Sequence, residues 1–328
     1  MSATVAVVLA GGRGTRLYPA SSPDTPKQFR AIAGERSLLE RTVDRAERFA
    51  DETVVLTRPA YADPVRELVD CDVLVEPEPK DTGPALVYAA HRLRDRAETL
   101  VCLPSDHHVG SGAFATAAER AAATARETGG LVTMGVEPTR AAVGYGYLKP
   151  GESVGEGVHR VEKFVEKPDP GAAARYREHG YRWNAGIFAW TPEALLSACE
   201  GTALEPLVAA LDAGDPEPFA ACEAVSVDYG VMEDAEDVFL VAAEFEWDDL
   251  GTWDALGRVL EADDSGTVVD GNALSFDAEG CVLATDESSH VAAVGVSNRV
   301  VAAYDGRVLV VPKHDAQRVR EVWDAVYD

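Results

Sequence analysis

A continuous run of apolar residues at positions 4–9 leads into a glycine-rich loop, and this junction restricts the fold more than any other feature. The run does not alternate with polar residues, which is typical of a central parallel strand buried on both faces. The loop reads Gly11-Gly12-Arg13-Gly14-Thr15-Arg16. Its glycines let backbone N–H groups approach phosphate oxygens closely, and its arginines add positive charge. The junction therefore predicts a phosphate-binding loop at the end of a buried strand.

Two familiar loops that bind phosphate also follow buried strands, and neither matches this one. The dinucleotide-binding loop has the spacing G-x-G-x-x-G, but Leu17 occupies the position of its third glycine. A Walker loop would continue with G-K-[ST], which the sequence lacks here. Instead Arg13, Arg16, Lys27 and Arg30 place cations in a short stretch of an otherwise acidic chain. Such local positive charge favours a small polyanionic ligand.

Apolar strands and helical stripes alternate along the first part of the chain. Strands are predicted at 53–57, 72–75, 99–103 and 131–135, and helices are predicted to begin at a Ser37–Glu40 capping box, at Pro84 and at about Ala113. This alternation predicts an α/β fold, with a Rossmann-like, mainly parallel sheet and helices on both faces. From about Gly144 the pattern changes, and segments 144–147 and 161–165 indicate strands of an inserted substrate region.

A second domain is predicted after residue 264, where the composition shifts. Short β-prone segments there alternate with turns such as 270–272 and 305–306, and one amphipathic helix at about 315–326 closes the chain. We therefore expect one domain over 1–264 and a small β domain over 265–328 that ends in a helix.

Charge and cysteine content exclude several classes of function. The net charge of −26 repels nucleic-acid backbones, so nonspecific binding to DNA or RNA is not expected. No apolar run reaches the roughly 18 residues that a membrane span needs, so no association with a membrane is expected. The five cysteines form no C-x-x-C pair, and their odd number argues against a disulfide framework or a zinc site. A reducing cytoplasm is the expected location.

The distribution of acidic residues also bears on the salt concentration at which the protein functions. Lysine is scarce, and Asp and Glu are spread along the whole chain. We hypothesise a halophilic adaptation, in which a densely carboxylated surface stays hydrated at high salt. The alternative is an ordinary acidic cytosolic protein.

Further motifs follow the loop in a fixed order. They are Pro26-Lys27-Gln28-Phe29, Pro84-Ala85, Pro104-Ser105-Asp106-His107, Gly144-Tyr145-Gly146, Phe164-Val165-Glu166-Lys167-Pro168, Trp183-Asn184-Ala185-Gly186-Ile187-Phe188, Ser226-Val227-Asp228-Tyr229 and Trp247-Asp248-Asp249-Leu250-Gly251-Thr252-Trp253. Together with G-G-x-G-T-R-L-x-P, this set resembles the sugar-nucleotide pyrophosphorylase family. The P-K-Q-F form resembles its mannose-1-phosphate guanylyltransferase branch, and the tail is similar to the left-handed β-helix-like domain of that branch.

The resemblance implies a nucleotidyltransferase. The implied reaction transfers GMP from GTP to mannose 1-phosphate by in-line attack of the sugar phosphate on the α-phosphorus, and it yields GDP-mannose and pyrophosphate with the help of Mg²⁺. Two alternatives stay open: the same chemistry with glucose 1-phosphate and UTP or dTTP, and a noncatalytic regulatory subunit that binds sugar nucleotide. The resemblance also implies a homodimer formed through the tail.

Residue roles follow from the resemblance, position by position. The implied nucleotide-binding residues are Gly11, Gly12, Arg13, Gly14, Thr15, Arg16, Lys27, Asp81, Thr82, Pro84 and Ser105. Backbone amides of the loop would hold the triphosphate. Arg16 would stabilise charge on the leaving pyrophosphate, and Lys27 would stabilise the pentacoordinate α-phosphate. Arg16, Lys27 and Asp106 are the expected catalytic residues.

The resemblance also implies a metal site and a sugar site. Asp106 and Asp249 each end an apolar strand and match positions that bind Mg²⁺, which takes a few carboxylates together with phosphates and water. The sugar-phosphate site is expected to comprise Gly146, Glu166, Lys167 and Asn184. A carboxylate can accept hydrogen bonds from sugar hydroxyls, and a lysine can meet the sugar phosphate.

One segment departs from the family pattern. Asp81 and Gly83 stand where the family usually has Asn and Ala. This segment is expected near the nucleobase, so the departure bears on base selectivity.

Overall fold

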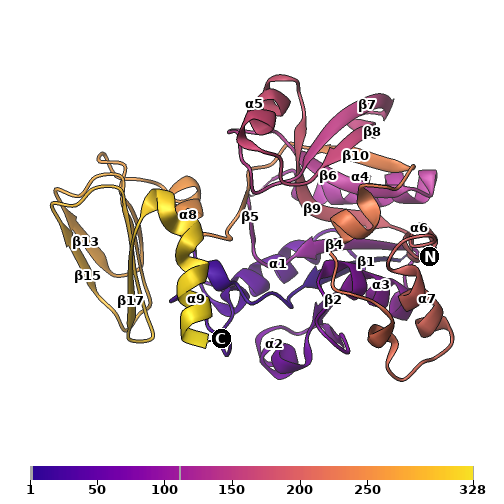
Figure 1. Ribbon diagram of the computed structural model, residues 1–328, viewed down its shortest axis with the longest axis horizontal. Helices are drawn as coiled ribbons and strands as arrows, with labels where there is room; N and C mark the ends of the chain where they lie inside the picture. The colour runs from indigo at the N-terminus through magenta and orange to yellow at the C-terminus, as the bar shows by residue number, and fades with distance from the viewer. Residues whose placement is uncertain (1–2, 111, 328) are drawn as a thin grey trace. The chain divides into compact units, whose positions relative to one another are not determined.

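The computed structural model describes residues 3–110 and 112–327. The chain forms two compact units. Unit 1 comprises Met1–Gly11, Val43–Pro104 and Gly110–Phe245, and unit 2 comprises Gly12–Thr42, Ser105–Val109 and Glu246–Asp328. Both units are therefore assembled from segments that lie far apart in the sequence (Figure 1).

A nine-stranded mixed sheet forms the centre of unit 1. Its spatial order is β3-β2-β1-β4-β9-β6-β10-β8-β7. The strands are β1 (Thr4–Leu9), β2 (Glu52–Thr57), β3 (Asp72–Val75), β4 (Thr99–Pro104), β6 (Leu131–Val136), β7 (Tyr147–Gly155), β8 (Val158–Val165), β9 (Arg182–Trp190) and β10 (Val238–Ala243). Strands β3, β2, β1 and β4 pair in parallel, as do β6 and β10, while β9 runs antiparallel between β4 and β6.

Helices cover the sheet and complete the α/β fold predicted from the sequence. They are α1 (Leu38–Ala46), α2 (Ala62–Leu68), α3 (Thr82–Leu93), α4 (Phe114–Thr128), α5 (Pro170–Glu178), α6 (Pro192–Ala198) and α7 (Glu205–Asp212), of which α1 begins in unit 2. Val5 and Val7 of β1 pack in one core with α3, α6 and α7. Ala6 and Val8, which point to the opposite face, are also fully buried, so β1 is the buried central strand that its apolar run predicts.

The sequence predicted the start of α1 correctly, whereas α3 begins at a different residue from the predicted one. The capping box before α1 forms as expected, because the Ser37 backbone N–H donates to Glu40 Oε2 at 2.9 Å and the Glu40 N–H donates to Ser37 Oγ at 3.2 Å. Helix α3 begins two residues before the predicted Pro84. The Asp81 carboxylate accepts from the Thr82 N–H at 2.7 Å, so the helix begins at Thr82.

Unit 2 contains the C-terminal β domain. The strands and helices of unit 2 are β5 (His107–Val109), β11 (Trp247–Asp249), α8 (Trp253–Val259), β12 (Val268–Asp270), β13 (Ala273–Phe276), β14 (Val282–Thr285), β15 (Val291–Val294), β16 (Arg299–Tyr304), β17 (Arg307–Pro312) and α9 (Val319–Tyr327), and those from β12 onward form the C-terminal β domain. Strands β12, β14 and β16 stack in parallel, and so do β13 and β15, which gives the repeating rungs of a β-helix-like domain. The predicted closing helix is α9, preceded by a 3₁₀ turn over Lys313–Arg318.

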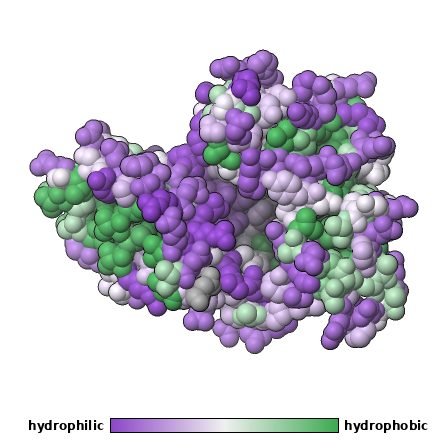
Figure 2. Space-filling model, in the orientation of Figure 1, coloured by the Kyte–Doolittle hydropathy of each residue, from purple (hydrophilic) through white to green (hydrophobic). Residues whose placement is uncertain are grey.

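Apolar side chains are exposed on this β domain. Leu274, Phe276, Val294, Val308 and Val310 each keep more than half of their surface accessible. Figure 2 shows hydrophobic residues gathered over these strands. None of the described helices is long and apolar enough to cross a membrane.

Candidate active site

A buried lysine between two aspartates is the first cluster of predicted site residues, and it lies within unit 2. Lys27 begins the 3₁₀ turn η2 (Lys27–Phe29) and is 7 % exposed. Its Nζ lies 2.8 Å from Asp106 Oδ2 and 3.7 Å from Asp249 Oδ1. Strands β5 and β11 pair antiparallel with Asp249 opposite His107, and this register brings Asp106 and Asp249 to the same cation.

The charges of this cluster stabilise one another. Burial would lower the pKa of Lys27, but the negative charges of Asp106 and Asp249 outweigh it and raise the pKa. Burial would likewise raise the pKa of Asp106, but the Lys27 ammonium holds it below its usual value. Lys27 and Asp106 are therefore both charged at neutral pH, inside a largely desolvated site.

The two aspartates suit a hard divalent cation. Their carboxylate oxygens converge on one point, which Lys27 Nζ occupies here. Within residues 3–110 and 112–327, no group of three or more His, Cys, Asp and Glu side chains is arranged to hold a metal. A pair of carboxylates is what Mg²⁺ uses when substrate phosphates and water supply its other ligands. Asp106 and Asp249 therefore fit a divalent cation that takes its other ligands from phosphates and water.

Glycines at two positions keep space for this cluster. Gly14 has a φ of +67°, and a Cβ there would lie 2.7 Å from Lys27 Cγ. A Cβ on Gly251 would lie 2.9 Å from Asp249 Oδ1 and 3.1 Å from Arg16 Nη2. Side chains at either position would displace the predicted catalytic groups, so the structure explains why both residues are glycine.

The remaining predicted residues of unit 2 lie along the same segments. Gly12 and Arg13 are exposed in the loop, and Thr15 begins the 3₁₀ turn η1 (Thr15–Leu17). The Gly12 carbonyl accepts a hydrogen bond from Gln28 Nε2 at 3.0 Å, which ties the loop to the turn that carries Lys27. Ser105, which directly precedes Asp106 in the sequence, is buried.

A second group of predicted residues lies within unit 1, where parallel strands end. Gly11 follows β1, and Asp81, Thr82 and Pro84 form the start of α3. Asp81 has a φ of +71°, an uncommon conformation for a residue with a side chain. A Cβ on Gly83 would lie 2.6 Å from the Val225 carbonyl oxygen, so close packing against the backbone favours glycine at this position.

Glu76 belongs to this strand edge and was not predicted as a site residue from the sequence. It follows β3 directly and is 5 % exposed. Its Oε2 has no hydrogen-bond partner, and a Cβ on Gly11 would lie 3.2 Å from its Oε1. Burial raises its pKa to about 7, and the charge of Asp81 adds to this shift while Arg58 opposes it. An acidic residue directly after an apolar strand was the available signal, as it was for Asp106.

The four predicted sugar-site residues come together elsewhere in unit 1. Glu166 and Lys167 follow β8, and their side chains form an ion pair. The Asn184 backbone N–H on β9 donates to the Gly146 carbonyl at 2.9 Å. A Cβ on Gly146 would lie 2.4 Å from Glu166 Oε2, so only glycine leaves that carboxylate in place.

A π-helical turn covers Asp228–Met232. It includes residues of a sequence motif for which no role was predicted. Asp228 Oδ1 accepts a hydrogen bond from Asn184 Nδ2 at 2.7 Å, and the Tyr229 ring lies 5.9 Å from Lys167 Nζ. Just after the turn, Glu233 Oε1 accepts from the Glu166 backbone N–H at 3.1 Å. Such π-helical turns are rare and are often found at functional sites.

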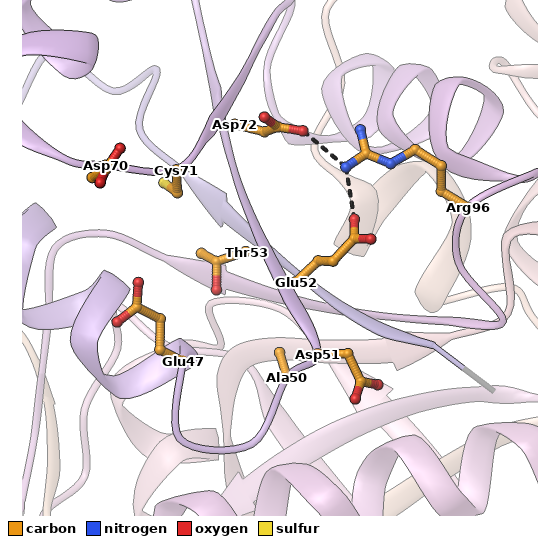
Figure 3. Close-up of a pocket in the computed structure, with 9 residues that line it drawn as sticks. All are labelled: Glu47, Ala50, Asp51, Glu52, Thr53, Asp70, Cys71, Asp72 and Arg96. Carbon is orange, nitrogen blue, oxygen red and sulfur yellow. Dashed lines mark hydrogen bonds and ion pairs between the residues drawn. The ribbon is translucent and has the colours of Figure 1, made fainter. Parts of the chain in front are cut away.

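An acidic pocket of about 420 Å³ also lies in unit 1 (Figure 3). Arg96 Nη2 bridges Glu52 at 2.6 Å and Asp72 at 2.8 Å, at the amino ends of β2 and β3. This edge is opposite to the carboxyl ends where α/β sheets bind ligands. Burial raises the pKa of Cys71 in this pocket to about 11, so its thiol is not a reactive thiolate.

Comparison with known families identifies the chain as a nucleotide-dependent transferase. Two family models match the chain: "Nucleotidyl transferase" over residues 5–266 and "MannoseP isomerase/GMP-like beta-helix domain" over residues 271–325. The chain belongs to the nucleotidyl transferase family and is an enzyme of that class, with the β-helix domain as its tail. Divalent metals are general in this family.

Named relatives narrow the comparison. Xanthan biosynthesis protein XanB of Xanthomonas campestris pv. campestris is 35 % identical over 98 % of this chain and 73 % of its own length. A mannose-1-phosphate guanylyltransferase of Escherichia coli is 33 % identical over 96 % of this chain and 72 % of its own length. A crystal structure described as mannose-1-phosphate geranyltransferase from Thermus thermophilus superposes with a TM-score of 0.93, at 38 % identity over 99 % of each chain.

Proposed function

We propose that this enzyme transfers GMP from GTP to mannose 1-phosphate. An oxygen of the sugar phosphate attacks the α-phosphorus of GTP, the bond to the β-phosphate oxygen breaks, and GDP-mannose and pyrophosphate result. The observation that carries the proposal is the buried Lys27 between Asp106 and Asp249. A charged lysine in a desolvated site suits the negative charge that develops on phosphoryl oxygens in this class of reaction.

The residues of this cluster, and those of the glycine-rich loop that precedes Lys27 in the sequence, each have a proposed role. Lys27 stabilises the α-phosphate during attack, and Arg16 stabilises the pyrophosphate as it leaves. Asp106 and Asp249 would hold Mg²⁺, which when bound supplies positive charge to the phosphates. The backbone of residues 11–15 offers N–H donors to the triphosphate.

The sugar cluster supports a hydroxyl-rich anionic acceptor. Glu166 presents a carboxylate oxygen, Oε2, that is buried and has no hydrogen-bond partner. Lys167 beside it provides a cation for the sugar phosphate. Asn184 is anchored on β9 and offers its amide to a hydroxyl.

Glu76 supports guanine as the base. Guanine presents two neighbouring N–H donors, at N1 and N2. The Glu76 carboxyl group has a pKa of about 7 and is therefore partly ionised near neutral pH, and its ionised form offers two acceptors to that edge. Uracil and thymine present one N–H donor flanked by carbonyl oxygens, which a carboxylate would repel. The relatives named guanylyltransferases favour the same base.

Two wider features are proposed with this function. We place the end of the catalytic domain near residue 264, and the matched spans of 5–266 and 271–325 support that boundary. All five cysteines are free, which suits a reducing cytoplasm.

One experiment tests the proposal against its alternatives. GTP, UTP and dTTP are each combined with mannose 1-phosphate and with glucose 1-phosphate in the presence of Mg²⁺, and pyrophosphate release is measured. We expect release above background for GTP with mannose 1-phosphate. Release with UTP or dTTP but not with GTP would overturn the proposed base, and no release with any pair would overturn the proposed reaction.

A further inference from the structure

The amide of Asn184 is held in a single orientation. Its Oδ1 accepts from the Gly186 backbone N–H at 3.0 Å and from Thr133 Oγ1 at 2.8 Å. A backbone N–H can only donate, so the atom facing Gly186 must be the oxygen. The Nδ2 group then faces Asp228 Oδ1 at 2.7 Å, which uses one of its two hydrogens. One amide hydrogen stays available for a ligand.

Asp228 is the acceptor that completes this arrangement. It is the first residue of the π-helical turn, which covers Asp228–Met232. Its Oδ1 accepts the hydrogen bond from Asn184 Nδ2. The carboxylate thus connects the π-helical turn to Asn184 of the sugar cluster.

The same turn also fixes Glu166. Glu233 Oε1, which follows the turn, accepts from the Glu166 backbone N–H at 3.1 Å. Tyr229 lies against the Lys167 ammonium. Three of the predicted sugar contacts are therefore each supported by one residue of the segment 228–233. Binding of the sugar phosphate depends on such supporting contacts, because a ligand group must be held in position before it binds.

We propose that Asp228 is a positioning residue for the acceptor sugar: its carboxylate orients the Asn184 amide so that one N–H is presented to a sugar hydroxyl. This inference rests on the proposed function, in which this cluster binds the sugar 1-phosphate. Asp228 itself does not touch the reacting atoms. Its effect is expected on the Michaelis constant of the sugar and not on that of the nucleotide.

Two substitutions test the role by kinetics. Asp228→Ala removes the acceptor, and a hydrogen bond to a charged group corresponds to on the order of tenfold or more in affinity. We expect the KM for mannose 1-phosphate to rise by about that factor, with the KM for GTP within about twofold of wild type. Asp228→Asn keeps an acceptor oxygen of the same reach, so it should recover much of the loss. Asp234→Asn, a neutralisation of an exposed neighbour, is the control and should leave both constants unchanged.

A double variant separates positioning from general damage. If Asp228 acts through Asn184, Asp228→Ala combined with Asn184→Ala should bind the sugar no more weakly than Asn184→Ala alone. Additive losses would overturn the inference, and so would equal changes in both Michaelis constants. Thermal unfolding of each variant shows whether it is folded, and Asp228→Asn remains as the test if Asp228→Ala does not fold. Inactive wild-type enzyme would refute the proposed function, whereas an active enzyme with an unaffected Asp228→Ala variant would refute only this inference.

Discussion

Glu76 shows how much a single residue depends on its surroundings. Its carboxyl group is buried, and one of its oxygens has no partner. Burial raises its pKa from 4.5 to about 7, so between pH 4.5 and 7 the folded protein holds a proton there that the unfolded chain has released. Between these two values the folded state binds more protons, and stability therefore falls as the pH rises through this range.

Glu76→Gln should remove this dependence on pH. Glutamine stays neutral, so the variant should gain stability relative to wild type as the pH rises from 4.5 to 8, by on the order of 3 kcal/mol in the free energy of unfolding. Urea unfolding at a series of pH values measures the difference. Glu78→Gln, at an exposed position two residues away, is the control and should show no such trend. A constant difference between Glu76→Gln and wild type would contradict the raised pKa.

The same substitution should change the choice of base. Glutamine offers one acceptor and one donor, which match the N3–H and a carbonyl oxygen of uracil but not the paired donors of guanine. We expect the ratio of kcat/KM for GTP to that for UTP to fall by about tenfold or more. An unchanged ratio in steady-state assays with both nucleotides would remove Glu76 from the base site.

At the scale of elements, the loop that precedes β7 offers a test, because one added methyl group there should weaken binding of the sugar phosphate. A Cβ on Gly146 would lie 2.4 Å from Glu166 Oε2, the end of a flexible side chain, whereas a Cβ on Gly144 would meet nothing within 4 Å. Gly146→Ala should therefore fold but displace Glu166 from its ion pair with Lys167. We expect the KM for the sugar phosphate to rise by about tenfold.

Gly144→Ala is the matched control in the same loop. It should have near-normal constants, and both variants should unfold within a few degrees of wild type. A normal KM for Gly146→Ala would show that Glu166 does not bind the sugar, while unfolding of Gly146→Ala would show that the loop cannot relax.

Comparison of elements shows what the sequence could predict. Apolar runs identified the buried strands, and the capping box identified the start of α1, because these signals lie within a few residues. The antiparallel insertion of β9 between β4 and β6 depends on pairing between distant segments, and no local pattern encodes it. The π-helical turn at Asp228–Met232 likewise has no signature of its own.

The distinction between local signals and contacts of distant segments also applies to the candidate site. Lys27, Asp106 and Asp249 could be named from motifs, and the structure brings them together. Glu76 and Asp228 were not assigned, because their roles depend on burial and on partners far away in the chain. Asp228 meets Asn184 across 44 positions, and that contact exists only once β9 and the turn are both folded.

The charge of the whole molecule is large enough to affect its stability. The net charge of −26 on 328 residues makes carboxylates repel one another when few ions screen them. The pocket of Figure 3 is an example, because Glu47 and Asp70 are exposed there beside other acids, with Arg96 as the cation among its lining residues. The screening length shrinks from about 30 Å at 0.01 M salt to about 3 Å at 1 M, so molar salt suppresses this repulsion.

Stability should therefore rise with salt. We expect the midpoint of thermal unfolding to increase steadily from 10 mM to molar KCl, as the halophilic hypothesis requires. Sucrose at matched osmolarity is excluded from the protein surface but does not screen charges, so it is the control for charge screening by KCl. It should stabilise the protein less than KCl does. The double variant Glu47→Gln with Asp70→Asn removes two repelling charges and should be more stable than wild type at 10 mM KCl but not at 2 M. Equal stability of the wild-type protein at both salt concentrations would reject the adaptation and leave an ordinary acidic enzyme.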